Sequence, residues 1–126
     1  MPAWSAQDLT TIDTTDEVRL ATLRRDGTLR TPVTIWAVVV GNEVCVRAVY
    51  GPESPWFRGT RSRHRGQLHV GSLSRDVAFE DVPDDLAPAI DAAYRRKYGG
   101  YATSIVDSTL TPQAREATLR LVPLGG

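Results

Sequence analysis

Two hairpin signals in the first half of the chain constrain its fold more than any other feature. Asp26-Gly27 and Gly41-Asn42 are dipeptides that tolerate positive φ, and both lie between apolar runs. These runs are rich in β-branched residues, which favour pleated strands. The pattern therefore predicts three consecutive strands joined as a meander, over residues 18–23, 29–40 and 43–49.

Pro32 lies inside the second of these strands, where it has no N–H to donate to a neighbouring strand. We therefore expect an irregularity at residues 31–33. Later in the chain, short alternating apolar segments indicate three more strands, over residues 67–70, 76–82 and 117–122.

Two further segments carry helical signals. Ser5 followed by Asp8 resembles a capping box and predicts one or two helical turns near the start of the chain. A longer helix is expected from Asp84-Asp85 to Gly99-Gly100, because the apolar residues between them recur at helical spacing. Six short strands, mostly hairpin-connected, with one long helix indicate an α+β fold built on an antiparallel barrel or strongly coiled sheet.

Two details of the second half are also predicted. Asp91 and Arg95 are four residues apart in the long helix and are expected to form an ion pair. Residues 101–112 are rich in turn and polar residues, so we expect a loop there, anchored by Ile105-Val106.

The chain of 126 residues fits a single domain over residues 1–126. Its formal net charge is zero, which argues against a nucleic-acid-binding protein and requires any anion site to be local. The only cysteine, Cys45, is expected in the core, which fits a reducing, cytoplasmic setting. The longest aliphatic run, residues 37–40, is far too short to span a membrane, so a soluble protein is expected.

The stretch around Ser54-Pro55 predicts a helix start, because serine can cap free N–H groups and proline fits the first helical position. Arg58 then lies in the first turn, where a positive charge is unfavourable. An anion bound at the helix start would remove this conflict by pairing with Arg58, or with the nearby Arg61, Arg63 or Arg65. The alternative is a solvated surface in an arginine-rich chain, in which 14 of the 15 basic residues are arginines.

Strand alternation places further residues beside this helix start. Arg30, Thr34 and Trp36 share one face of the second strand, and Cys45, Arg47 and Val49 share one face of the third. Four of these residues are therefore candidates for a common surface: Arg30, Thr34, Trp36 and Arg47. The alternative is that both arginines face solvent and Trp36 belongs to the core.

Several common sites are not indicated. His64 and His69 are five residues apart across a predicted helix-to-strand junction, which matches no metal-binding pattern, so no metal site is expected. The chain has no Gly-x-Ser-x-Gly motif. A dinucleotide-binding fingerprint must follow a strand, but Gly99-Gly100 follows a predicted helix.

The order of these segments resembles the FMN-binding split-barrel superfamily, which includes the pyridoxamine-phosphate oxidases and the deazaflavin-dependent nitroreductases. Within it, the chain is most similar to the uncharacterised DUF2255 family. The resemblance extends over residues 18–123, and these features carry it: Arg47, Ser54-Pro55-Trp56-Phe57-Arg58, Asp76-Val77-Ala78-Phe79, Ala92-Ala93-Tyr94-Arg95-Arg96-Lys97-Tyr98-Gly99 and Ala117-Thr118-Leu119-Arg120-Leu121-Val122-Pro123.

This resemblance implies a six-stranded split barrel that forms a homodimer and binds a flavin at the dimer interface. It places the cofactor phosphate at the helix start, near Ser54, Arg58 and Arg47. By position, Arg30 and Thr34 are further cofactor-binding candidates. If a flavin binds, Trp36 and Trp56 would shape its ring pocket together with Tyr50, Tyr98 and Tyr101; the alternative is that these aromatics belong to the core or the dimer interface. The chain lacks the arginine–lysine pair of the oxidase group, so FMN, a deazaflavin, haem and no cofactor all stay open.

The first functional hypothesis is an oxidoreductase acting on a small molecule, in which the flavin transfers hydride or electrons. Tyr98 and Tyr101 are then candidate proton donors. The alternatives are a non-redox protein that binds a small anionic ligand in the same cleft, and a cofactor-free enzyme on the same barrel.

Overall fold

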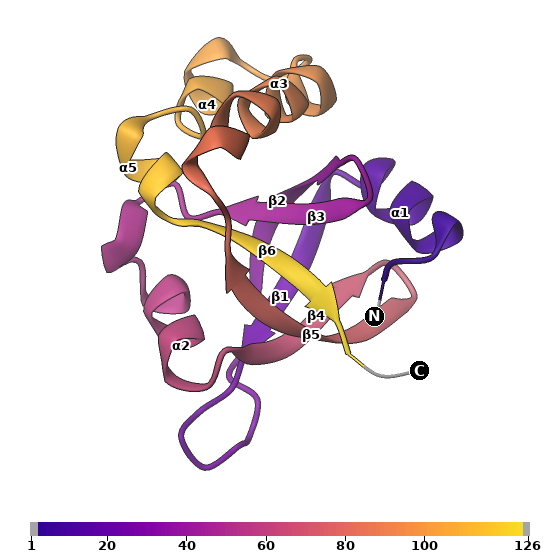
Figure 1. The fold of residues 1–126 in the computed structure, drawn as a ribbon, viewed down its shortest axis with the longest axis vertical. Helices are drawn as coiled ribbons and strands as arrows, with labels where there is room; N and C mark the ends of the chain where they lie inside the picture. Colours follow the sequence, from indigo (N-terminus) through magenta and orange to yellow (C-terminus); the bar gives the residue numbers. More distant parts are fainter. Residues whose placement is uncertain (1–2, 125–126) are drawn as a thin grey trace.

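The computed structural model describes residues 3–124, which form a closed antiparallel barrel with the strand order β1-β2-β3-β6-β5-β4 (Figure 1). The strands are β1 (Glu17–Thr22), β2 (Val33–Val40), β3 (Glu43–Arg47), β4 (Arg65–Val70), β5 (Leu73–Asp81) and β6 (Thr118–Pro123). The predicted six-stranded antiparallel barrel is therefore confirmed. β2 begins directly after Pro32, because proline cannot continue the hydrogen-bonded ladder.

Within the described residues, five α-helices pack around the barrel. They are α1 (Ala6–Asp13), α2 (Pro55–Arg63), α3 (Ala87–Tyr98), α4 (Thr103–Asp107) and α5 (Pro112–Glu116), and 3₁₀ turns at Gly51–Glu53 and Asp84–Leu86 precede α2 and α3. Among residues 3–124, none of the helices combines the length and the apolar character of a membrane span.

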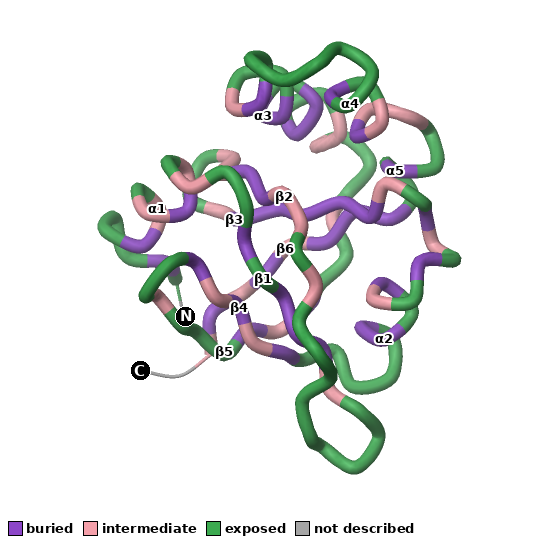
Figure 2. The backbone as a smooth tube through the Cα atoms, turned by 180° about the vertical axis from the view of Figure 1, so that it is seen from behind, coloured by how far each residue is buried: buried purple, intermediate pink, exposed green. Residues whose placement is uncertain are grey.

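The apolar side chains form two cores. The larger core fills the barrel with inward-facing residues such as Val18, Val44 and Leu119. The second lies outside the barrel, where α3 packs on β2 and β3 through Val38, Cys45 and other buried residues. Because β3 is covered on both faces, its residues are buried almost without interruption, whereas the β1–β2 loop is exposed (Figure 2).

Contacts at the two predicted helices confirm their positions. Ser5 Oγ accepts a hydrogen bond from the N–H of Asp8 at 3.0 Å, which caps α1. Lys97, near the end of α3, donates from Nζ to the carbonyls of Ile12 (2.8 Å) and Ala37 (2.6 Å). One side chain thus joins α3 to both α1 and β2.

Two sequence predictions for the second half are wrong. The expected loop over residues 101–112 contains α4 and the start of α5, and only Val106 of its predicted anchor is buried, while Ile105 is 48% exposed. Asp91 does not pair with Arg95; instead its carboxylate binds Arg47 and Arg115. The pairing with Arg95 fails because Asp91 lies on the buried face of α3, where residues from distant strands and helices reach it.

Candidate functional site

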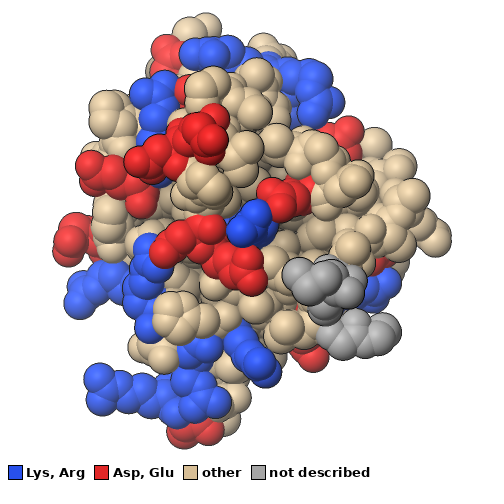
Figure 3. Space-filling model, viewed as in Figure 1, with Lys and Arg blue, Asp and Glu red and all other residues tan. Residues whose placement is uncertain are grey.

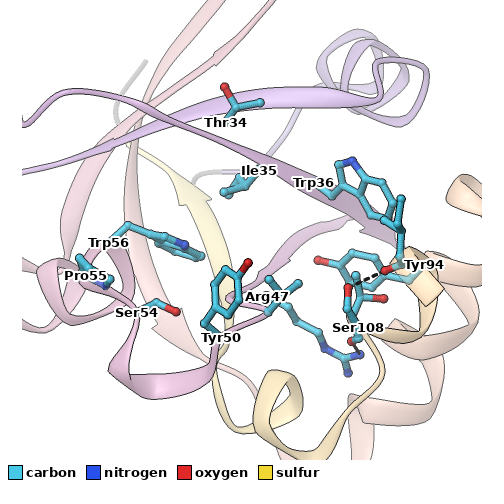
Figure 4. Close-up of a pocket in the computed structure, with 13 residues that line it drawn as sticks. Thr34, Ile35, Trp36, Arg47, Tyr50, Ser54, Pro55, Trp56, Tyr94 and Ser108 are labelled. Atoms are coloured by element: carbon cyan, nitrogen blue, oxygen red, sulfur yellow. Dashed lines mark hydrogen bonds between the residues drawn. The ribbon is translucent and has the colours of Figure 1, made fainter. Parts of the chain in front are cut away.

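A cavity of about 350 Å³ opens between the outer face of β2, the end of β3, the start of α2 and the helical segment from α3 to α4 (Figure 4). We call it the Arg47 cavity. Aromatic and aliphatic side chains form most of its wall, and five polar residues interrupt them. The apolar residues are Ile35, Trp36, Val49, Tyr50, Pro55, Trp56, Tyr94 and Ile105; the polar residues are Thr34, Arg47, Ser54, Ser108 and Thr109.

Three buried polar groups of this cavity have no hydrogen-bond partner within residues 3–124. They are Nη2 of Arg47, Oγ of Ser54 and the hydroxyl of Tyr94. The three residues are 4%, 5% and 0% exposed, respectively. In Figure 4 the hydroxyls of Ser54 and Tyr94 point from opposite sides into the space between them. Since most buried polar groups in proteins are paired, three unpaired groups on residues of one cavity call for an explanation.

Arg47 is held by residues from three other parts of the fold. Its Nε donates to Oγ1 of Thr118 (3.0 Å), which is its register partner on β6. Its Nη1 donates to Oδ1 of Asp91 (2.6 Å) and to the carbonyl of Thr109 (2.9 Å). The second carboxylate oxygen of Asp91 accepts from Nη2 of Arg115 (2.7 Å). These bonds leave Nη2 as the one nitrogen of Arg47 without a partner in the described chain.

The protonation states of this network follow from burial and charge. Burial raises the pKa of Asp91, but hydrogen bonds from Arg115 and Arg47 outweigh it and hold the pKa below its ordinary value of 3.8. Asp91 is therefore ionised at neutral pH. Burial raises the pKa of Tyr94 far above its ordinary value of 10.0, so its hydroxyl keeps its proton and can donate it in a hydrogen bond.

The start of α2 adds backbone donors to the cavity. Ser54 directly precedes the helix and its side chain makes no capping bond, contrary to the sequence prediction. Pro55 has no N–H, and the N–H groups of the following first-turn residues have no partner inside the helix. The first turn also contains no acidic residue. This corner therefore presents a free hydroxyl and the positive end of a helix dipole on the same side of the cavity.

The structure brings together five of the seven residues predicted to bind a cofactor: Thr34, Trp36, Arg47, Ser54 and Trp56 all line the Arg47 cavity. Of the adjacent aromatics after Pro55, Phe57 is buried in the barrel core and Trp56 borders the cavity. Their binding roles stay predictions, but their common location agrees with the strand alternation.

The other two predicted residues, Arg30 and Arg58, are exposed and do not line the cavity. Arg30 lies against α2, where its Nε would be 3.6 Å from a Cβ at Gly59. A role for either residue in holding a phosphate also stays a prediction.

The expected cluster of arginines at the start of α2 does not form within one chain. Arg61 pairs with Asp81 (2.9 Å) and Arg63 donates to the carbonyl of Arg25 (3.0 Å). Both belong to the last turn of α2, where positive charge complements the helix dipole. Figure 3 shows basic side chains over α2 and the neighbouring β1–β2 loop.

Neither tyrosine proposed as a proton donor lines the cavity. Tyr98 is buried behind Trp36, on which its ring stacks at a centroid distance of 3.9 Å, and its hydroxyl bonds to the backbone of Asp16 and Ala37. The hydroxyl of Tyr101 donates to Asp16 Oδ2 (2.7 Å). Sequence reasoning missed Tyr94 and Asp91 as site residues, although a signal existed: they are three residues apart in the stripe of α3 that faces the core.

The barrel and its helices define a split-barrel protein, and solved structures of that fold support this. The chain superposes on the structure of an F420 reductase with a TM-score of 0.64 at 16% identity, covering 92% of each chain. A FAD-binding protein from Mesorhizobium loti matches with a TM-score of 0.59 at 18% identity, covering 98% of this chain and 91% of the other. A FAD- and haem-binding protein from Mycobacterium smegmatis gives 0.60 at 22% identity, covering 96% and 66%.

The family model described as "Uncharacterized protein conserved in bacteria (DUF2255)" matches residues 8–121. The chain therefore belongs to the DUF2255 family, and the resemblance predicted from sequence is confirmed. No curated protein matches the sequence.

Proposed function

We propose that this protein binds a flavin or deazaflavin cofactor in the Arg47 cavity and acts as an oxidoreductase on a small molecule. The observation that carries the proposal is the pairing of an aromatic wall with three buried, unpartnered polar groups. A flavin has the same two parts, a planar ring system and a polar chain that ends in phosphate. The similarity to the structures of an F420 reductase and of a FAD-binding protein supports the choice of this cofactor class.

The size and chemistry of the cavity fit such a group. About 350 Å³ lies at the lower end of the range for small-molecule sites, roughly 300–1,000 Å³, and such sites combine a mostly apolar wall with a few fixed polar groups. The cavity therefore fits a ring and a short chain better than a whole dinucleotide. A longer cofactor would extend out of the mouth, where Tyr50 is 79% exposed.

Each part of the wall has a role under this proposal. Trp36 and Trp56 border the space for the ring, and stacking on Tyr98 fixes the position of Trp36. Arg47 and Ser54 hold the anionic group, together with the first N–H groups of α2. When bound, the cofactor supplies the hydride or electron transfer, while the protein orients it and excludes water.

We also propose that two copies of the chain form a homodimer across the cavity mouth. Tyr50 and Ile105 both line the cavity, yet they are 79% and 48% exposed. Exposed apolar side chains grouped at one mouth are typical of an interaction surface. Light scattering at several protein concentrations tests this, and a monomer at all of them would contradict it.

Cofactor binding is tested by titrating the purified protein with FMN and, separately, with F420, following the visible spectrum and the fluorescence of the ring. We expect saturable binding of at least one of them, and weaker binding by Trp56→Leu. The matched control is Trp4→Leu, because Trp4 packs in the barrel core away from the cavity. Absence of binding by both cofactors at micromolar concentration would overturn the proposal and favour the non-redox anion-binding alternative.

A further inference from the structure

We propose that Arg47, Ser54 and Tyr94 form an anion subsite for one phosphate or carboxylate group, and that Asp91 is the positioning residue that holds Arg47 in it. The inference rests on the proposed function of the cavity, but it concerns the charge of the ligand rather than its ring. In this subsite Tyr94 donates to the anion, a role that the sequence suggested for Arg58.

The first support is the location of the unpartnered groups. Five buried side-chain atoms within residues 3–124 have no hydrogen-bond partner, and three of them belong to residues of this one cavity. The other two are Oδ1 of Asp13 on α1 and Nε of Arg120 on β6, which belong to different elements and do not line this cavity. Only the cavity groups therefore gather around a space that a ligand can enter.

The second support is the chemistry of the three groups. A guanidinium nitrogen can only donate, and the hydroxyl of Tyr94 keeps its proton because of its burial. The hydroxyl of Ser54 rotates to suit its partner. A ligand atom that satisfies all three must therefore be an acceptor, and an oxyanion offers several acceptor oxygens at once.

The third support is the charge of the network behind Arg47. Arg47 and Arg115 share the single carboxylate of Asp91, at 2.6 Å and 2.7 Å, so the three residues together carry one positive charge. Arg47 is almost completely buried, and a buried charge is stable only when it is well paired. A bound anion would complete this pairing.

Asp91 acts through Arg47 rather than on the ligand, because it does not line the cavity. Its two oxygens are both occupied: Oδ1 accepts from Nη1 of Arg47 and, at 3.5 Å, from Nε of Arg115, and Oδ2 accepts from Nη2 of Arg115. These bonds fix the carboxylate and, with it, the Arg47 guanidinium. Without the carboxylate, the guanidinium keeps its bonds to Thr118 Oγ1 and to the carbonyl of Thr109, but it loses its charged partner and the 2.6 Å contact, so Arg47 is held less firmly. Loss of Asp91 should therefore weaken the recognition of charge specifically.

The experiment compares FMN with riboflavin, which has the same ring and lacks the phosphate, by fluorescence titration of the full chain. We expect wild type to bind FMN at least about tenfold more tightly, the size of a charge-assisted hydrogen bond. Tyr94→Phe, Ser54→Ala and Asp91→Asn should each reduce this FMN-to-riboflavin ratio severalfold. A purely structural defect would weaken both ligands alike and leave the ratio unchanged, which would overturn the assigned role of that residue.

Matched controls come from outside the cavity. Tyr101→Phe removes the hydroxyl of a tyrosine that does not line the cavity, and Ser74→Ala removes an exposed serine hydroxyl on β5. Both should leave the ratio unchanged, and an equal loss in the controls would contradict the assignment of the subsite.

Thermal unfolding with inorganic phosphate separates the subsite from the flavin proposal. If neither flavin binds but phosphate stabilises wild type more than Tyr94→Phe, the subsite stands and the flavin proposal fails. If FMN and riboflavin bind with equal affinity, the flavin proposal stands and the subsite is wrong. If FMN, riboflavin and phosphate all fail to bind, the subsite is refuted.

Discussion

Removing the hydroxyl of Tyr94 should stabilise the ligand-free protein, whereas the same change at Tyr98 should destabilise it. The two tyrosines lie one turn apart on α3, and both are completely buried. They differ in their hydroxyls. Tyr98 donates to the carbonyl of Asp16 (2.6 Å) and accepts from the N–H of Ala37 (3.1 Å), whereas Tyr94 has no partner in the described part of the chain.

The expected magnitudes follow from the cost of burying polar groups. An unsatisfied buried hydroxyl costs about 1–3 kcal/mol, so Tyr94→Phe should raise the free energy of unfolding by up to that amount. Tyr98→Phe leaves the partners of the hydroxyl unsatisfied and should lower the free energy by about 1–3 kcal/mol. For a chain of this size, each kcal/mol shifts Tm by roughly 3–5 °C.

The assay is urea and thermal unfolding of the two variants and wild type, without phosphate and with about 10 mM phosphate, which is ample for a weak anion site. Without phosphate, the order of stability should be Tyr94→Phe, wild type, Tyr98→Phe. With phosphate, wild type should gain more than Tyr94→Phe. If Tyr94→Phe loses as much stability as Tyr98→Phe, the hydroxyl of Tyr94 has a partner and the argument for the cavity is refuted.

Three further predictions concern pH and packing. The pKa of Asp91 is lowered in the folded protein, so the unfolded chain takes up the proton first as pH falls. The stability advantage of wild type over Asp91→Asn should therefore be constant above about pH 5 and shrink below about pH 4. An advantage that stays constant in acid would contradict this. Burial lowers the pKa of Lys97 from 10.5 to about 8, so the unfolded chain binds more protons than the folded protein between these pH values. Wild type should therefore gain stability relative to Lys97→Met as pH rises from about 8 to about 10. A difference in urea stability between the two proteins that does not change with pH would refute this. A Cβ at Gly66 would lie 2.2 Å from the carbonyl oxygen of Ala21, so Gly66→Ala should lower stability by about 1–3 kcal/mol, and an unchanged Tm would contradict the tight β1–β4 contact.

Local patterns predicted most of the barrel. Alternation of apolar residues and the turns at Asp26-Gly27 and Gly41-Asn42 located the first three strands, and Pro32 marked the start of β2. These signals succeed because strand pairing between neighbours in sequence depends on short-range turn chemistry. The short helices α4 and α5 were missed, because five-residue helices carry too few residues for a periodic pattern.

The site was predicted only in part, because its polar contacts join distant segments. Alternation grouped Arg30, Thr34, Trp36 and Arg47, and all of these except Arg30 line the cavity. It could not show that Arg47 would meet Asp91 and Thr118, which are 44 and 71 residues away in sequence. The i, i+4 rule therefore assigned Asp91 the wrong partner, since a buried pair made by the tertiary fold replaces a weak surface pair.

A crystal structure of the protein grown with excess FMN or F420 would test the central claim most directly. The account predicts cofactor density in the Arg47 cavity, with phosphate oxygens within hydrogen-bond distance of Arg47 Nη2, Ser54 Oγ and the hydroxyl of Tyr94. Cofactor bound elsewhere, or a cavity filled by side chains of a second copy, would contradict it.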